Sequence, residues 1–139
     1  MNYTFTTDKD KLDVQAIHDF IQKETYWGKD RSLKEVQLTI KNSLCFGLYD
    51  QFDNQLGFAR VVTDFVVFAY LMDVIIFKKF QGKGLGKHLI RFILEHESLA
   101  SIQTFALKTR DAQGLYQQFG FQKVGGSPLW MAKDSFVYL

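Results

Sequence analysis

The chain of 139 residues is predicted to fold as one α/β domain, with a mixed, mostly antiparallel central sheet and helices on both faces. Three strand-like stretches follow one another without a helix between them, which favours an antiparallel meander. Strand-like stretches flank a helix further along the chain, which favours some parallel pairing. The stretch from Ala69 to Phe77 is almost continuously apolar, which is typical of a central strand covered on both faces.

Composition excludes several classes of protein. Hydrophobic residues make up 47% of the chain and aromatic residues 16%, which is too apolar for a disordered protein. The single cysteine, Cys45, has no partner for an internal disulfide, and we expect it to be a small buried residue. No signal peptide follows Met1, and no apolar run reaches the roughly 20 residues of a membrane span. We therefore expect one cytoplasmic domain over residues 1–139, with no membrane partner.

The first third of the chain predicts a strand and two helices. Residues 3–6 alternate as in a short strand. Asp13 precedes apolar residues spaced three and four apart, which predicts a helix that begins there. Ser32 and Glu35 form a capping box, so a second helix should begin after Ser32 and run to about Asn42.

The rest of the chain predicts the meander and then an alternation of helices and strands. Apolar runs separated by turn residues predict the strands, and apolar stripes of helical spacing predict the helices. The expected meander strands are 44–49, 57–63 and 69–77, with a hairpin turn at 50–54. We then expect a helix at 84–96, a strand at 105–107, a helix at 112–119 and two last strands at 121–124 and 129–131.

The segment from residue 74 to residue 87, VIIFKKFQGKGLGK, carries the clearest chemical signal. A buried strand leads into a glycine-rich loop, and the loop opens a helix. Glycine allows sharp turns and a close approach to a ligand, and the loop contains Gly82, Gly84 and Gly86. The loop N–H groups and the positive end of the helix would bind an anion, with Lys83 and Lys87 at the rim. We expect this anion to be a pyrophosphate.

Two common nucleotide loops do not match this segment. A P-loop would need Ser or Thr after Gly86-Lys87, where the chain has His88, and Gly in place of Gln81. The dinucleotide fingerprint would need a third glycine at Lys87. The pattern Gln81-x-x-Gly84-x-Gly86 instead resembles the coenzyme A pyrophosphate loop of the GNAT superfamily of N-acetyltransferases.

A second motif agrees with this resemblance. The pattern Ala112-x-x-Leu115-Tyr116-x-x-x-Gly120-Phe121 is similar to the C-terminal motif of the same superfamily. One helix and one strand separate it from the glycine loop, as in the superfamily. The order of predicted elements also resembles that fold over nearly the whole chain.

The resemblance implies acetyl-CoA as the cosubstrate. Its pantetheine arm would lie beside the strand at 74–76, from which the strand near Phe105 would splay away, and an N–H near Ile76 would polarise the thioester carbonyl. Main-chain N–H groups from Gln81 to Gly86 would hold the pyrophosphate. Thr109 stands where the superfamily often has an Asn that contacts the cofactor. In this chain a hydroxyl would have to make that contact. The implied cofactor residues are Val74, Ile75, Ile76, Gln81, Gly82, Lys83, Gly84, Leu85, Gly86, Lys87 and Thr109.

The implied reaction is direct transfer of the acetyl group to a primary amine of a small molecule or a protein. Tyr116 is the expected proton donor to the thiolate; the alternative is a packed tyrosine whose hydroxyl binds backbone. The candidates for the general base are Asp73, Asp64 and Glu24, and a water relay would need none of them. The alternative for Asp73 is a structural carboxylate satisfied by backbone or by Arg60, and it is the favoured one.

Several other residues bear on the acceptor, on metal binding and on partners. Trp27 and Asp64 are expected to contact the acceptor, although core packing is the alternative for Trp27. Asp111 is expected to cap a helix. The histidines show no metal-ligand spacing, so no metal is expected. The net charge of +2 does not favour nucleic acid, and the apolar residues 136–139 would pack on the sheet or on the second subunit of a homodimer.

Two rival functions use the same loop. A non-catalytic module that binds acetyl-CoA without turnover would keep the loop and lack a productive acceptor site. A small nucleotide-binding domain would use the same glycines for a different pyrophosphate. The acceptor itself is encoded in no motif, because it depends on loop shape.

Overall fold

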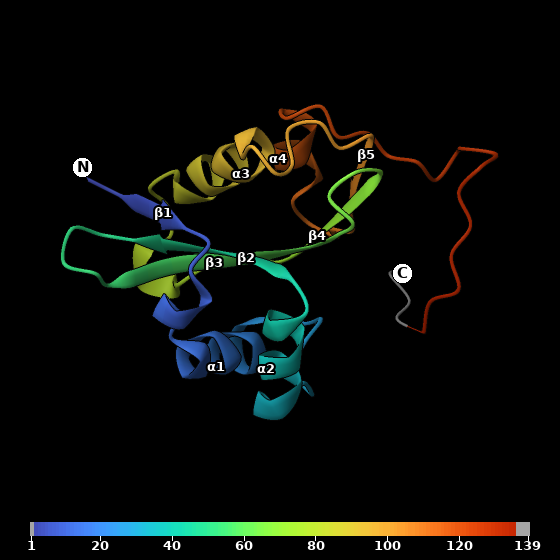
Figure 1. Cartoon of the computed structure of the whole chain (residues 1–139). Coiled ribbons are helices and arrows are strands. Elements are labelled where there is room, and N and C mark those ends of the chain that lie inside the picture. Colours follow the sequence, from blue (N-terminus) through green and yellow to red (C-terminus); the bar gives the residue numbers. More distant parts are fainter. Residues whose placement is uncertain (1, 136–139) are drawn as a thin grey trace. The chain divides into compact units, whose positions relative to one another are not determined.

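A mixed sheet of five strands runs through residues 2–135, the part of the chain that this computed structural model describes (Figure 1). The strands lie in the sheet in the order of the sequence. Neighbouring strands from β1 to β4 are antiparallel, and β4 and β5 are parallel. The strands are β1 (Thr4–Thr6), β2 (Leu44–Tyr49), β3 (Gln55–Thr63), β4 (Phe68–Ile76) and β5 (Thr104–Leu107). The prediction of a mixed, mostly antiparallel sheet is confirmed.

Helices cover both faces of this sheet, as predicted (Figure 1). The helices α1 (Val14–Glu24) and α2 (Leu33–Lys41) lie on one face, and α3 (Leu85–Glu95) lies on the other. Two short 3-10 turns, η1 (Lys9–Lys11) and η2 (Lys78–Phe80), precede α1 and α3. No helix among the described residues is long and apolar enough to cross a bilayer.

Side chains that alternate along β2 build the two halves of the core. Cys45 points into the cluster that α1 and α2 form with the sheet, where Phe58 and Ile75 also lie. The next residue, Phe46, packs edge-on against Phe92 of α3, with 6.0 Å between ring centroids. Cys45 is 1% exposed, and burial raises its thiol pKa to about 11, so the prediction of a small buried residue is confirmed.

Local capping signals set the helix starts where the sequence predicts them. The Asp13 carboxylate accepts the N–H of Ala16 (3.0 Å) at the start of α1. At α2, the Ser32 hydroxyl accepts the Glu35 N–H (3.1 Å), and the Glu35 carboxylate accepts the Ser32 N–H (2.9 Å). Both predicted caps are therefore present.

The chain divides into two compact units, with the boundary between Leu107 and Lys108. The first unit holds the sheet and the helices α1 to α3. The second holds the short helix α4 (Gln113–Gln117), where the predicted helix was longer. The assignment of one domain to residues 1–139 stays a prediction.

Two details predicted for the second unit are wrong. Asp111 does not cap α4: the capping position is Ala112, whose N–H donates to the Thr109 hydroxyl (3.1 Å), because the helix begins one residue later than expected. Residues 121–124 and 129–131 form no strand within residues 108–135. A strand needs a hydrogen-bonded neighbour and a buried face, whereas Leu129 and Met131 are 84% and 94% exposed. The predicted packing of residues 136–139 lies outside the described residues.

Candidate active site

One edge of β4 has no strand beside it over the second half of the strand. The parallel pairing with β5 begins at Phe68 with Thr104 and ends at Leu71 with Leu107. Over residues 72–76, β4 is paired only with β3 among the described residues. The sheet therefore leaves an open backbone edge at the predicted place of the pantetheine arm.

The backbone of Ile76 faces this open edge. The Phe77 N–H donates to the Leu56 carbonyl (3.0 Å), so Ile76 and Gly57 form a non-hydrogen-bonded pair of the antiparallel ladder. The N–H and carbonyl of Ile76 then point away from β3. The carbonyl accepts the side-chain amide of Gln81 (2.8 Å), whereas the N–H is left for a chain lying along the edge.

The loop that follows presents a run of unpaired N–H groups. Among the described residues, none of the N–H groups from Gly82 to Lys87 donates to a protein acceptor. Gly82 and Gly84 have positive φ angles of 82° and 77°, and Gly84 is the residue before α3. Alternate left-handed residues make a concave set of N–H groups, and the first turn of a helix adds further donors. This arrangement suits an anion.

Gln81 has a different place from the one predicted for it. Its N–H already donates to the Lys78 carbonyl (3.3 Å), and its side chain bonds to Ile76. It therefore holds the loop against the end of β4, and the run of free donors begins at Gly82. A contact between the Gln81 N–H and the pyrophosphate stays a prediction, one that this hydrogen bond does not favour.

The chemistry of the donor set fits a pyrophosphate group. A Cβ atom added at Gly82 or Gly84 would meet no protein atom within 4 Å, so the positive φ and not crowding requires glycine at these positions. Lys83 and Lys87 add positive charge next to the free N–H groups, and residues 74–94 contain no acidic residue. The loop thus offers donors and cations with no competing carboxylate.

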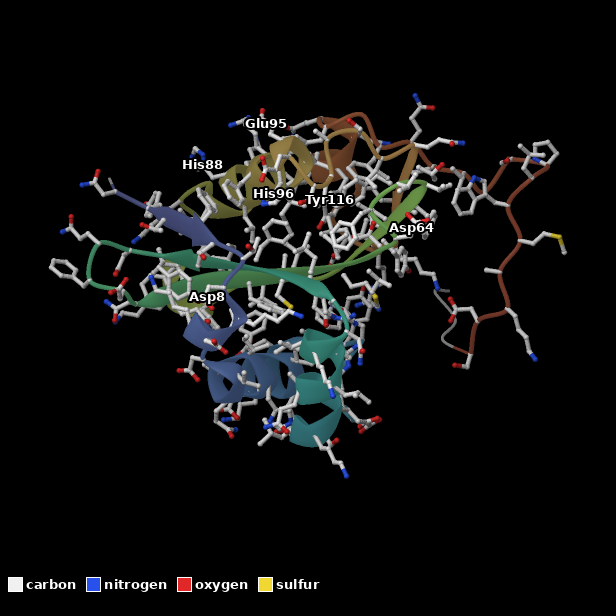
Figure 2. The ribbon with its side chains drawn as sticks, in the orientation of Figure 1. Asp8, Asp64, His88, Glu95, His96 and Tyr116 are labelled. Carbon is white, nitrogen blue, oxygen red and sulfur yellow. The ribbon has the colours of Figure 1, made fainter. Side chains whose placement is uncertain are left out.

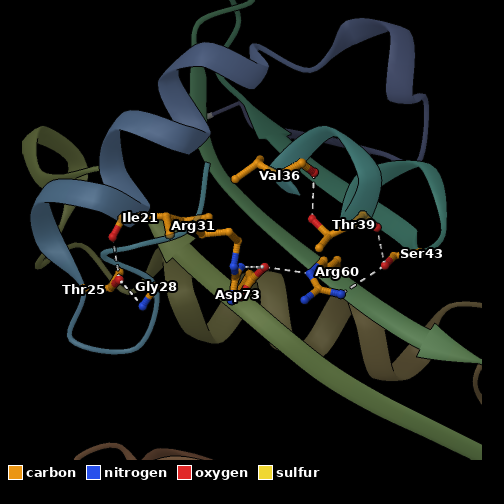
Figure 3. Close-up of polar contacts among 9 residues, drawn as sticks. All are labelled: Ile21, Thr25, Gly28, Arg31, Val36, Thr39, Ser43, Arg60 and Asp73. Atoms are coloured by element: carbon orange, nitrogen blue, oxygen red, sulfur yellow. Dashed lines mark hydrogen bonds and ion pairs between the residues drawn. The ribbon is translucent and has the colours of Figure 1, made fainter. Parts of the chain in front are cut away.

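Asp73 lies in a bulge of β4 and is held by two arginines (Figure 3). Its carboxylate oxygen Oδ2 accepts Nε of Arg60 (2.6 Å) and Nη1 of Arg31 (2.8 Å). The side chain of Asp73 is 2% exposed. This geometry is the one expected if Asp73 is a structural carboxylate paired with Arg60, the alternative given for it above. A role for Asp73 as general base stays a prediction that this geometry does not favour.

Trp27 belongs to the segment between α1 and α2, residues 25–32. It is half-buried and packs against the core cluster beneath α1 and α2. The guanidinium carbon of Arg31 lies 5.6 Å from the centroid of its ring. Core packing, the alternative given for Trp27, therefore describes its contacts, and a contact with the acceptor stays a prediction. No sequence signal had pointed to Arg31.

Asp64 builds the turn between β3 and β4, where Figure 2 labels it. Its Oδ1 accepts the N–H groups of Val66 (2.9 Å), Val67 (2.8 Å) and Phe68 (3.2 Å). These hydrogen bonds hold the carboxyl pKa below its usual value. The carboxylate is thus used inside the turn, and its predicted contact with the acceptor stays a prediction.

The lowered pKa gives a testable pH dependence. Because the folded pKa lies below the unfolded value of about 4, the carboxylate stabilises the fold above that pH, and the contribution is lost as pH falls through the folded pKa. We expect Asp64→Asn to lower the thermal midpoint at pH 7, since an amide oxygen is a weaker acceptor. The difference from wild type should shrink as the pH falls below about 4, because the carboxylate is then increasingly protonated. Asp30→Asn, at an exposed position without a hydrogen bond in residues 2–135, should follow wild type; a constant Asp64→Asn deficit would contradict the assignment.

The second unit carries the two remaining predicted site residues. Tyr116 is buried, and burial, followed by the charge of Asp111, raises the pKa of its phenol to about 12. Within residues 108–135 its hydroxyl has no hydrogen-bond partner, and its ring packs edge-on against Phe121 (5.8 Å between centroids). The Thr109 hydroxyl accepts the Ala112 N–H and can still donate.

The histidines are dispersed, and none lies in a cluster of ligands. Figure 2 labels His88, which lies on α3, and His96, which follows the last residue of α3. His96 packs edge-on against Phe46 (5.5 Å between centroids). His18 bonds through Nε2 to the Arg31 carbonyl (3.0 Å). Over residues 2–135, no three His, Cys, Asp or Glu side chains come together as a metal site would need.

Comparisons with known proteins show which family the chain resembles. The model of the acetyltransferase (GNAT) domain family matches residues 41–123. The uncharacterised N-acetyltransferase ycf52 of Pyropia yezoensis is 36% identical over 102 residues, which cover 70% of this chain and 58% of that protein. A candidate acetyltransferase of Gibberella zeae is 29% identical over 112 residues, covering 68% of this chain and 63% of its own length. The chain thus spans about three fifths of the length of these relatives.

The fold has a close counterpart among solved structures. A crystal structure from Xanthomonas campestris pv. campestris, described as a candidate acetyltransferase of the GNAT family, is 35% identical and superposes with a TM-score of 0.88. The match covers 99% of this chain and 97% of that one. The likeness therefore includes the sheet, α3 and the loop between them.

Proposed function

Since the chain belongs to the GNAT family of acetyltransferases, we propose that it transfers an acetyl group from acetyl-CoA directly to a primary amine of a small molecule or a protein. The observation that carries the proposal is the run of unpaired N–H groups from Gly82 to Lys87 beside the open edge of β4. A diphosphate and an extended amide-containing arm are the two parts of coenzyme A that such a surface would bind.

Different residues of the chain would bind different parts of acetyl-CoA. The N–H groups of residues 82–87, with Lys83 and Lys87, bind the pyrophosphate. The edge of β4 at 74–76 binds the pantetheine arm, and the Ile76 N–H polarises the thioester carbonyl. Thr109 donates a further hydrogen bond to the cofactor. Acetyl-CoA supplies the activated acetyl group when it is bound.

The transfer step needs two proton movements. A neutral amine attacks the thioester carbon, a C–N bond forms and the C–S bond breaks; the amine loses one proton, and the thiolate gains one. We assign the donor role to Tyr116, because it stands where the superfamily commonly places this donor and its phenol, with a pKa of about 12, is protonated at neutral pH. Water is the proposed route for the proton of the amine, since Asp73 and Asp64 are engaged in other bonds.

The test follows acetyl-CoA and thiol separately. Calorimetry measures acetyl-CoA binding, and a thiol reagent measures CoA release with amino sugars, polyamines, amino acid esters and peptides. We expect wild type to release CoA with at least one class of amine, and Tyr116→Phe to lower kcat by about 10²-fold with binding unchanged. Tyr49→Phe is the matched control, because the Tyr49 hydroxyl is buried with no hydrogen-bond partner in residues 2–135 and should not affect turnover.

The rival functions give different results in this experiment. Acetyl-CoA binding without product from any amine would indicate a non-catalytic binding module. Competition by ATP as strong as that by CoA would indicate a nucleotide-binding domain. Absence of acetyl-CoA binding would overturn the proposal. The cytoplasmic location and the homodimer stay predictions.

A further inference from the structure

We propose that Arg31, Asp73 and Arg60, the Arg-Asp-Arg cluster, are positioning residues that fix the bulge of β4 and join it to the segment 25–32 (Figure 3). The cluster would fix the position of the segment 25–32, which carries the predicted acceptor residue Trp27, relative to the acetyl group. This inference rests on the proposed acetyl transfer and adds residues that act on the reaction through the backbone.

The bulge needs to be held because its backbone is strained. Asp73 and Val74 on β4 lie opposite the single residue Ala59 on β3, since the register passes from Arg60–Met72 to Phe58–Ile75. Asp73 has a φ of 52°, a left-handed conformation that costs an L-residue about 1–2 kcal/mol. A bulge re-aims the residues that follow it. The conformation of Asp73 therefore affects where the Ile76 N–H points.

The contacts of the Asp73 carboxylate can hold this conformation. Both lone pairs of Oδ2 are used, by Arg60 Nε at 2.6 Å and Arg31 Nη1 at 2.8 Å. Arg60 continues the network to α2: its Nη1 donates to the Ser43 hydroxyl (3.2 Å), which donates to the Thr39 carbonyl (2.6 Å). The bulge is thus tied to the end of α2 on one side.

Arg31 ties the bulge to the segment 25–32 on the other side. That segment is cross-linked by its own hydrogen bonds: the Thr25 hydroxyl donates to the Ile21 carbonyl (2.6 Å) and accepts the Gly28 N–H (3.2 Å). The Arg31 N–H donates to the Gly28 carbonyl (3.0 Å), and the Arg31 guanidinium lies over Trp27. The hydrogen-bonded segment that carries the predicted acceptor residue Trp27 is therefore joined to β4 through the Arg31–Asp73 ion pair.

Arg31 is the residue to change first, because Asp73 keeps Arg60 when it is removed. We expect Arg31→Met to lower kcat about tenfold or more, since small misplacements of reacting groups cost up to about 10²-fold. Its acetyl-CoA dissociation constant should stay within about twofold of wild type, because Arg60 still holds Asp73 and with it the edge of β4. Lys29→Met, an exposed cation of the same segment with no hydrogen bond or ion pair in residues 2–135, is the matched control and should match wild type in both quantities.

A double-variant cycle separates positioning from base catalysis. If Arg31 and Asp73 act together in positioning, kcat should fall by a similar factor in Arg31→Met, in Asp73→Asn and in the double variant. If Asp73 is instead the base, Asp73→Asn should lose far more than Arg31→Met. That result, or an Arg31→Met kcat within about twofold of wild type, would overturn the inference.

The remaining outcomes are also decisive. If Arg31→Met shows no cooperative unfolding, Arg31→Lys takes its place. The retained charge should keep the fold, but a lysine ammonium cannot both pair with Asp73 and lie over Trp27 as the guanidinium does, so the junction should loosen and kcat should still fall. A folded Arg31→Lys with wild-type kcat would then overturn the inference. Wild-type protein that binds no acetyl-CoA and forms no product would refute the proposed function and this role with it.

Discussion

Gly84→Val is expected to weaken acetyl-CoA binding at least about a hundredfold while leaving the protein folded. Gly84 has φ 77° and ψ 11°, a left-handed conformation in which a β-branched residue is a genuine outlier. Valine would favour a negative φ at this position. The N–H groups before and after residue 84 would then point in different directions. Their convergence on one anion is what the binding depends on, so the affinity should fall even if every donor is still present.

The fold should tolerate this change because the site is open. A Cβ at Gly84 would meet no protein atom within 4 Å, so valine does not collide with the core. Calorimetry with acetyl-CoA measures the affinity, and thermal unfolding confirms the fold. Gly125→Val is the control: its Cβ also meets no atom within 4 Å, but its φ is not in the left-handed range. An affinity for Gly84→Val within about threefold of wild type would refute the loop as the anion site.

The parts of the structure that the sequence predicts correctly depend on neighbouring residues. The capping box of Ser32 and Glu35 involves residues three apart, and it forms as expected. The loop from Gly82 to Gly84 is predicted from the spacing of its own glycines. Both glycines adopt positive φ angles, which other residues rarely do. β2 spans the predicted residues 44–49, because its apolar run is bounded by a turn on either side.

The parts that the sequence does not predict depend on contacts between distant residues. Arg31 and Asp73 are 42 residues apart, and nothing near Arg31 indicates an ion pair with β4. The bulge at Asp73 arises from the register against β3, which no local pattern encodes. The predicted strands at 121–124 and 129–131 fail for the same reason, since apolar alternation does not form a strand without a neighbour.

Arg60→Met is expected to lower the free energy of unfolding by about 3 kcal/mol, the largest loss of stability among the cluster variants. The Arg60 side chain is 7% exposed, against 18% for Arg31, so the carboxylate of Asp73 would lose its more deeply buried cation. Breaking one side of a buried pair costs more than the pair contributes, because the remaining charge stays desolvated. We place the loss at the lower end of the usual range since Arg31 still contacts Asp73. Urea unfolding followed by circular dichroism measures it.

The double variant Arg60→Met/Asp73→Asn tests whether the uncompensated charge is the cause. Asparagine tolerates the left-handed conformation at position 73, so the second change removes the carboxylate charge without adding backbone strain. We expect the double variant to recover about half of the loss seen in Arg60→Met. If the double variant is instead less stable than Arg60→Met, the loss comes from missing contacts of the arginine and not from the buried carboxylate. Arg31→Met provides the comparison for the more exposed arginine. It should lower the free energy of unfolding less than Arg60→Met, because water reaches the Arg31 guanidinium.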